Sequence, residues 1–151
     1  MSAAPQHVTA AASRVLLVVA DCAVSQAAIR RTVELAGGSA VTVVGVGAEH
    51  TSRAEHASAT VEPEQLRRSV ALAMSVLENA GVVALGHIAV TGSPARTLAR
   101  VARTRGARVV VLDQLGLSAG GGLAAELRRR MYGSGIVVVT ANDRGGRWVV
   151  P

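Results

Sequence analysis

The chain has 151 residues, which fits one ordinary domain, and half of them are hydrophobic. Because Phe is absent and the only aromatic residues are Tyr132 and Trp148, Ala, Val and Leu must fill the core, which suits parallel strands buried on both faces. The formal net charge is +6, but the arginines are spread along the sequence and lack aromatic neighbours for stacking on bases, so we expect no nucleic-acid binding.

Apolar runs and helical repeats alternate from the start of the chain. Residues 1–12 have no periodicity and are interpreted as a flexible tail. The run 14–20 (RVLLVVA) is typical of a buried strand, and residues 21–23 follow as a loop. Residues 25–36 have helical spacing and end at two glycines, after which 40–46 (AVTVVGV) predicts a second strand.

The same alternation continues to the last strand. A helix is predicted from Pro63 to Ala80, a third strand over 83–91, and a helix that starts at Pro94 with Ser93 as its N-cap. A strand over 108–112, a glycine-rich loop over 113–122 and a short helix over 123–131 come next. Residues 136–140 form the last predicted strand, and 142–151 are interpreted as a C-terminal tail.

This order of elements predicts an α/β domain over residues 13–141. Strict alternation of strand and helix indicates an open five-stranded parallel sheet, doubly wound and Rossmann-like. Ligands of such sheets bind outside the carboxyl ends of the strands, near the reversal of strand order. The residues that follow the first, second and fourth strands are therefore the candidates for a site.

The cysteine content and the amino-terminal residues bear on location. The single cysteine, Cys22, excludes an internal disulfide and is consistent with a reducing compartment. Residues 1–12 lack the features of a signal peptide, and the apolar run 15–20 is too short to cross a membrane. We expect a cytoplasmic protein that does not bind membranes. All basic side chains except His are Arg, which is typical of a GC-rich, actinobacterial genome.

Several stretches, in the right order and spacing, resemble the universal stress protein family of adenine-nucleotide-binding α/β proteins. Residues 14–36 are similar to its first strand and helix, and 90–95 (VTGSPA) to its V-x-G-x-P turn. Residues 106–111 (GARVVV) are similar to its fourth strand, 116–118 (GLS) to the loop that follows, and 136–139 to its closing strand. The resemblance implies a regulatory stress-response protein.

The resemblance also implies a nucleotide site. Members that bind ATP carry G-x-x-G, nine residues and then G-[ST] after the fourth strand, and an Asp after the first. Glycines allow backbone N–H groups to approach phosphate, and a helix N-terminus favours its charge. The positions implied here as ligand-binding are Asp21, Val46, Gly116, Gly120, Gly121 and Gly122.

The phosphate-loop region departs from that pattern. Asp113 occupies the first glycine position, and five residues (117–121) separate Gly116 from Gly122 where nine are usual. Leu123 stands where Ser or Thr would donate a hydrogen bond, and a gap-free match puts Ala20 at the Asp position. We therefore expect degenerate or absent ATP binding. The alternative is a nucleotide sensor with a shortened loop and slow ATP hydrolysis.

Other residues leave two interpretations open. Asp21 is placed to bind a ribose hydroxyl or to cap the helix after it. The run from Arg128 to Arg130 is a solvated helix face or a support for phosphate. Cys22 is a small inert residue or a thiol sensor. The four histidines show no metal spacing, and no catalytic constellation is visible, so no catalytic or metal-binding residue is assigned.

The last predicted strand has a different significance. It is short, apolar and β-branched, and as the last strand of an open sheet it leaves an edge that invites pairing. Members of the resembled family commonly dimerise through this strand. We therefore expect a homodimer through residues Ile136 to Thr140, with a further protein partner possible and Trp148 as a candidate anchor.

Overall fold

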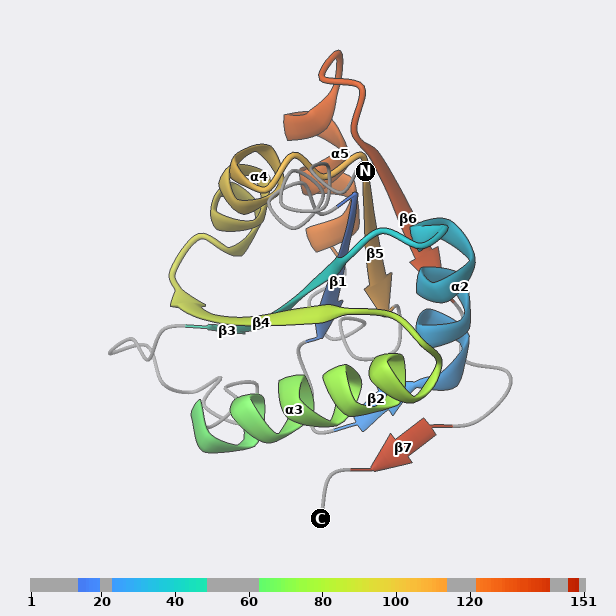
Figure 1. Ribbon diagram of the computed structural model, residues 1–151. Helices are drawn as coiled ribbons and strands as arrows, with labels where there is room; N and C mark the ends of the chain where they lie inside the picture. Colours follow the sequence, from blue (N-terminus) through green and yellow to red (C-terminus); the bar gives the residue numbers. More distant parts are fainter. Residues whose placement is uncertain (1–13, 20–22, 49–62, 114–121, 142–146, 150–151) are drawn as a thin grey trace.

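The computed structural model describes residues 14–19, 23–48, 63–113, 122–141 and 147–149. Five strands form one open sheet in the order β4-β3-β1-β5-β6, and every pairing in it is parallel (Figure 1). Its strands are β1 (Val15–Val19), β3 (Val41–Ala48), β4 (Ala84–Thr91), β5 (Val109–Asp113) and β6 (Val137–Ala141). The strand order reverses at β1, as in a doubly wound sheet, so the predicted fold class is confirmed.

Helices cover both faces of this sheet (Figure 1). They are α2 (Gln26–Ala36), α3 (Pro63–Asn79), α4 (Pro94–Thr104) and α5 (Leu123–Met131). Alternate residues of β1 enter different cores: Leu17 packs with residues of α2 and α3, whereas Leu16 and Val18 pack with residues of α4 and α5. Burial on both faces explains why β1 is apolar at every position.

Local signals set the ends of the helices. The side chain of Ser25 caps α2 by accepting a hydrogen bond from the Ala28 N–H at 3.2 Å, and Gly37 ends this helix with a left-handed φ of 55°. Pro94 begins α4 as predicted, and Ser93 is its N-cap residue. The Ser93 side chain makes no capping bond, and the Ser93 backbone N–H donates to the Thr91 hydroxyl at 3.0 Å.

Two glycines let α3 lie close against β3 and β4. A Cβ at Gly45 would lie 2.7 Å from a methyl carbon of Val70, and one at Gly86 would lie 2.7 Å from the sulfur of Met74. Both distances are shorter than real Cβ contacts. The absence of a side chain at these positions therefore allows α3 to cover one face of the edge strand β4.

A second, two-stranded sheet differs from the predictions. Strand β2 (Ala23–Ser25) pairs antiparallel with β7 (Arg147–Val149), so that Val24 lies opposite Trp148 in the register. Val24 is buried and joins the core beside α2. Ala23 had been interpreted as part of a loop and residues 142–151 as a tail. Strands of three residues are too short to show a period, which is why the sequence did not reveal them.

Candidate functional site

The candidate site lies at the carboxyl edge of the large sheet. There β1 ends at Val19 and β5 at Asp113, and α5 begins after Gly122. The strand order reverses between β3 and β5 around β1, so a crevice for a ligand is expected at this point. Of the predicted ligand-binding residues, Val46 and Gly122 are described. Asp21, Gly116, Gly120 and Gly121 lie outside the described residues.

Val46 belongs to the core. Its side chain is buried in the cluster that includes Leu98 of α4, and it pairs with Ala89 of β4 in the register. Strand β3 continues beyond it to Ala48, two residues further than predicted. Since its side chain is occupied by packing, the backbone is the part of Val46 that a ligand could meet.

Gly122 is the N-cap residue of α5. Its φ of −104° can be adopted by any residue type, and no side-chain hydrogen bond caps the helix at this position. The Glu126 N–H donates to the Gly122 carbonyl at 2.9 Å, which closes the first turn. The N–H groups of the first turn before Glu126 have no partner in the helix, and they are the groups that could bind an anion.

The first residue of α5 offers no donor besides its backbone. The side chain of Leu123 is half-buried and packs against the core cluster that contains Leu127 and Met131. An apolar side chain held in this way cannot replace the hydroxyl of Ser or Thr at the same position. Leu123 therefore departs from the phosphate-binding pattern both in its residue type and in its packing.

The structure changes two interpretations made from sequence. Ser25 is the residue that caps α2, so the capping role considered for Asp21 belongs to Ser25. The run from Arg128 to Arg130 lies in the last turn of α5, at the end opposite Gly122. Arg130 contacts Glu126 at 3.4 Å, and Arg128 donates to the Val138 carbonyl at 3.3 Å. These arginines are thus six or more residues from Gly122 along the helix, a rise of roughly 9 Å or more.

A second concave region, which sequence reasoning missed, lies between β4 and α4. It has a volume of about 440 Å³, and its polar lining includes His87, Arg100 and Arg105. The available signal was the absence of Asp and Glu from residues 79–112. The absence of acidic residues indicates a cationic groove only when β4 is known to be an edge strand with α4 beside it.

Two kinds of feature are absent from the described part of the chain. No group of three or more His, Cys, Asp or Glu side chains there could hold a metal ion. No helix among the described residues is both long and apolar enough to cross a membrane.

The chain matches proteins of known family and structure. The model of the "Universal stress protein family" matches residues 12–142. A universal stress protein from Archaeoglobus fulgidus has a similar structure, with 18% sequence identity, a TM-score of 0.62, and coverage of 85% of this chain and 98% of that one. No curated protein matches the chain in sequence at a significant level.

Several of the similar structures contain nucleotides. The universal stress protein from Archaeoglobus fulgidus in complex with dAMP is 17% identical, with a TM-score of 0.56, and the match covers 85% of this chain and 97% of that one. A universal stress protein in complex with cAMP is 17% identical, with a TM-score of 0.58, and the match covers 87% of this chain and 99% of that one. The fold is therefore shared with these proteins, and the family match over most of its length shows that the chain belongs to the universal stress protein family.

Proposed function

We propose that this protein is a regulatory stress-response protein of the cytoplasm that acts as a homodimer and through protein contacts, with degenerate nucleotide binding. The observation that carries the proposal is the packing of Leu123 into the core at the first position of α5. Members of the family that bind ATP have a Ser or Thr hydroxyl at that position. Without it, a bound phosphate loses a hydrogen bond that is worth about 1 kcal/mol or more.

Asp113 adds to this argument. It is the last residue of β5, and the loop that follows it leads to α5. A carboxylate about 4 Å from a phosphate repels it by about 4 kcal/mol per unit charge near a protein surface. The loss of a donor and the gain of a negative charge act in the same direction, so we expect nucleotide affinity well below that of ATP-binding relatives.

The alternative is a nucleotide sensor. It is supported by the dAMP and cAMP bound in structurally similar universal stress proteins. It is also supported by the N–H groups of the first turn of α5, next to Gly122, which have no partner within the helix. In this case affinity would come from backbone donors alone.

Isothermal titration calorimetry with ATP, AMP and cAMP, with and without Mg²⁺, separates the two functions. We expect no saturable heat up to about 1 mM nucleotide, a dissociation constant that corresponds to roughly −4 kcal/mol. Gly122→Asp and Gly122→Asn are matched variants, because both side chains are good N-caps and only Asp is charged. Micromolar binding that is weakened by Gly122→Asp and kept by Gly122→Asn would establish the sensor instead.

The homodimer is supported by the edge formed by β6. Val137 of this strand is 56% exposed, and no described strand pairs with its outer side. Two copies could pair antiparallel along this edge and cover Val137.

Sedimentation equilibrium tests the dimer. Val137→Asp should raise its dissociation constant roughly a hundredfold, because an unpaired carboxylate costs several kcal/mol in an apolar interface. Leu85→Asp, on the edge strand at the other side of the sheet, is the control and should leave the mass unchanged. A wild-type monomer, or a dimer that is indifferent to Val137→Asp, would refute pairing through β6.

A further inference from the structure

Most of the net positive charge comes from one stretch of the chain, because that stretch contains arginines and no acidic residue. Residues 79–112 contain five arginines and no acidic residue, which gives +5 of the total of +6. This stretch forms β4, α4 and most of β5. Two of its arginines, Arg100 and Arg105, lie beside the edge strand β4. The arginines are Arg96, Arg100, Arg103, Arg105 and Arg108.

A groove lies within this charged region. It has a volume of about 440 Å³ and runs between β4 and α4. His87 and Ala89 line it from β4, and their register partners Val44 and Val46 belong to the core beneath α4. Helix α4 thus covers the inner strands on this face and leaves the side chains of β4 open. The opposite face of β4 is packed against α3.

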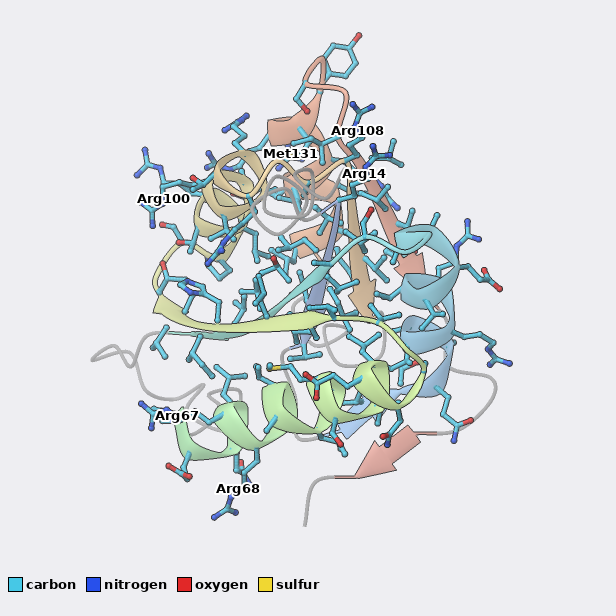
Figure 2. The ribbon with its side chains drawn as sticks, viewed as in Figure 1. Arg14, Arg67, Arg68, Arg100, Arg108 and Met131 are labelled. Carbon is cyan, nitrogen blue, oxygen red and sulfur yellow. The ribbon has the colours of Figure 1, made fainter. Side chains whose placement is uncertain are left out.

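The polar groups of the groove are donors or cations. Arg100 and Arg105 form no ion pair with any described residue, and Figure 2 shows Arg100 projecting outward from α4. The Thr91 hydroxyl oxygen accepts bonds from the Ser93 N–H and from the Thr97 hydroxyl, both at 3.0 Å. As a hydroxyl, Thr91 can donate a hydrogen bond as well as accept one. A groove lined in this way is complementary to anionic groups.

The backbone of β4 adds a second set of unused groups. The Val41 N–H donates to the Val83 carbonyl at 2.9 Å, so odd-numbered residues of β4 turn their backbone groups towards β3. The even-numbered residues Gly86, Ile88 and Val90 then direct N–H and C=O groups outward. No described strand pairs with this side of β4, whose eight residues make it a long edge. An extended peptide could satisfy these groups.

We propose that the free edge of β4 binds an extended acidic segment of a partner protein, which adds to the sheet as a further strand. Alternate side chains of such a strand point to one face. Carboxylates at every second position would therefore enter the groove beside His87, Arg100 and Arg105. This proposal rests on the regulatory function proposed above and names the chemistry of its protein partner.

Charge and composition disfavour other occupants. A second copy of the chain would bring the same arginines to the same edge, and like charges would repel. A nucleic acid strand would require several aromatic side chains on which successive bases stack, and no Phe, Tyr or Trp lines the groove. A peptide backbone also satisfies the outward N–H and C=O groups of β4, which a nucleic acid does not.

The test uses a fluorescein-labelled peptide of eight residues with alternating Glu and Thr, which matches the length of β4. Fluorescence anisotropy with the full chain should give saturable binding that weakens as salt is raised. A peptide of the same composition with all Glu residues in one block should bind at least fivefold more weakly, because its carboxylates cannot all face the groove. Equal affinity for the two peptides would overturn strand addition.

Two sets of variants test separately the arginine charges of the groove and the outward backbone groups of β4. Replacing Arg100 and Arg105 together by Gln should weaken binding of the alternating peptide roughly tenfold, as expected for two exposed ion pairs. Arg67 and Arg68, exposed on α3, are the control pair and should have no effect when replaced by Gln. Val90→Pro removes one outward N–H at an edge, where Pro is tolerated, and should weaken binding at least threefold, whereas Val90→Ala should not.

Two further outcomes would overturn the proposal. One is the absence of binding by a wild-type protein whose thermal unfolding is cooperative. The other is tighter binding of a twelve-nucleotide oligo-dT that depends on Arg100 and Arg105, which would identify the groove as a nucleic-acid site. Neither outcome depends on nucleotide calorimetry or on the mass of the dimer, so failure here is distinguishable from failure of the proposed function.

Discussion

The two edge strands of the sheet, β4 and β6, protect their free backbone groups in different ways. Strand β6 has five residues, and the Val137 N–H donates to the Arg108 carbonyl, so its even-numbered residues face outward. One of these outward groups, the Val138 carbonyl, already accepts a bond from Arg128 at 3.3 Å. Strand β4 has eight residues, and no described side chain bonds to its outward groups.

Under the two proposals, the two edges of one sheet serve different partners. At β6 a single guanidinium bonds to the edge, and in the proposed dimer it would have to leave before a second copy could pair there. At β4 the protection is the surrounding positive charge, which repels another copy of this chain and attracts an acidic segment. A short edge with a removable bond suits self-association, and a long cationic edge suits a partner of opposite charge.

The largest effect is expected from disturbing the support of the β4 edge. Gly86→Val would place its side chain against Met74 and Val70 of α3. We expect the free energy of unfolding to fall by about 1–3 kcal/mol, as for overpacked cores, measured by urea denaturation. Ala89→Val adds methyl groups on the open face of the same strand and should change stability by less than about 0.5 kcal/mol. An equal loss of unfolding free energy in both variants would show that neither face of β4 accommodates a larger side chain.

A smaller effect is expected at the other edge. Arg128→Ala frees the Val138 carbonyl to accept an N–H from a second copy, so the dimer should tighten about fivefold, which corresponds to about 1 kcal/mol. Arg129→Ala is the control, because the Arg129 side chain makes no bond to a described residue. Sedimentation velocity over a concentration series measures both. A dimer that weakens in Arg128→Ala alone would mean that Arg128 holds the partner.

Much of the fold could be predicted because local patterns report burial. The helix over residues 123–131 has the predicted bounds, and the five apolar runs form the five strands of the large sheet. The small sheet was missed because β2 and β7 are too short for a period and lie far apart in sequence. The order of the strands in the sheet decides which strands lie at its edges. The local sequence pattern carries no information on that order.

The candidate site could be predicted less well. Gly122 was identified as part of the loop, and the structure places it at the start of α5. The run from Arg128 to Arg130 was expected near that loop, whose residues 114–121 lie outside the described residues. The structure places the run in the last turn of α5, with Arg128 bonded to β6. His87, Arg100 and Arg105 come from a strand and a helix that meet only in three dimensions, which is why the groove was not foreseen.

The smallest predicted effect concerns Thr42, which lies between the two edges. It is fully buried on β3 beside Leu85 of β4 in the register, and its hydroxyl has no hydrogen-bond partner among the described residues. A buried unsatisfied hydroxyl carries a desolvation penalty that an isosteric Val lacks. Thr42→Val should therefore raise the free energy of unfolding by about 0.5 kcal/mol.

Thr32 supplies the matched control for this change. It is equally buried, but its hydroxyl donates to the Ala28 carbonyl at 2.7 Å, so Thr32→Val should lower stability by about 1 kcal/mol. Opposite signs for the two variants, measured in the same urea titration, would confirm that Thr42 is unsatisfied. If Thr42→Val also lowers stability, water must reach its hydroxyl past Leu85. The β4 edge would then be more accessible to water than the packing of its side chains indicates. The difference between the β4 edge and the β6 edge would be larger still.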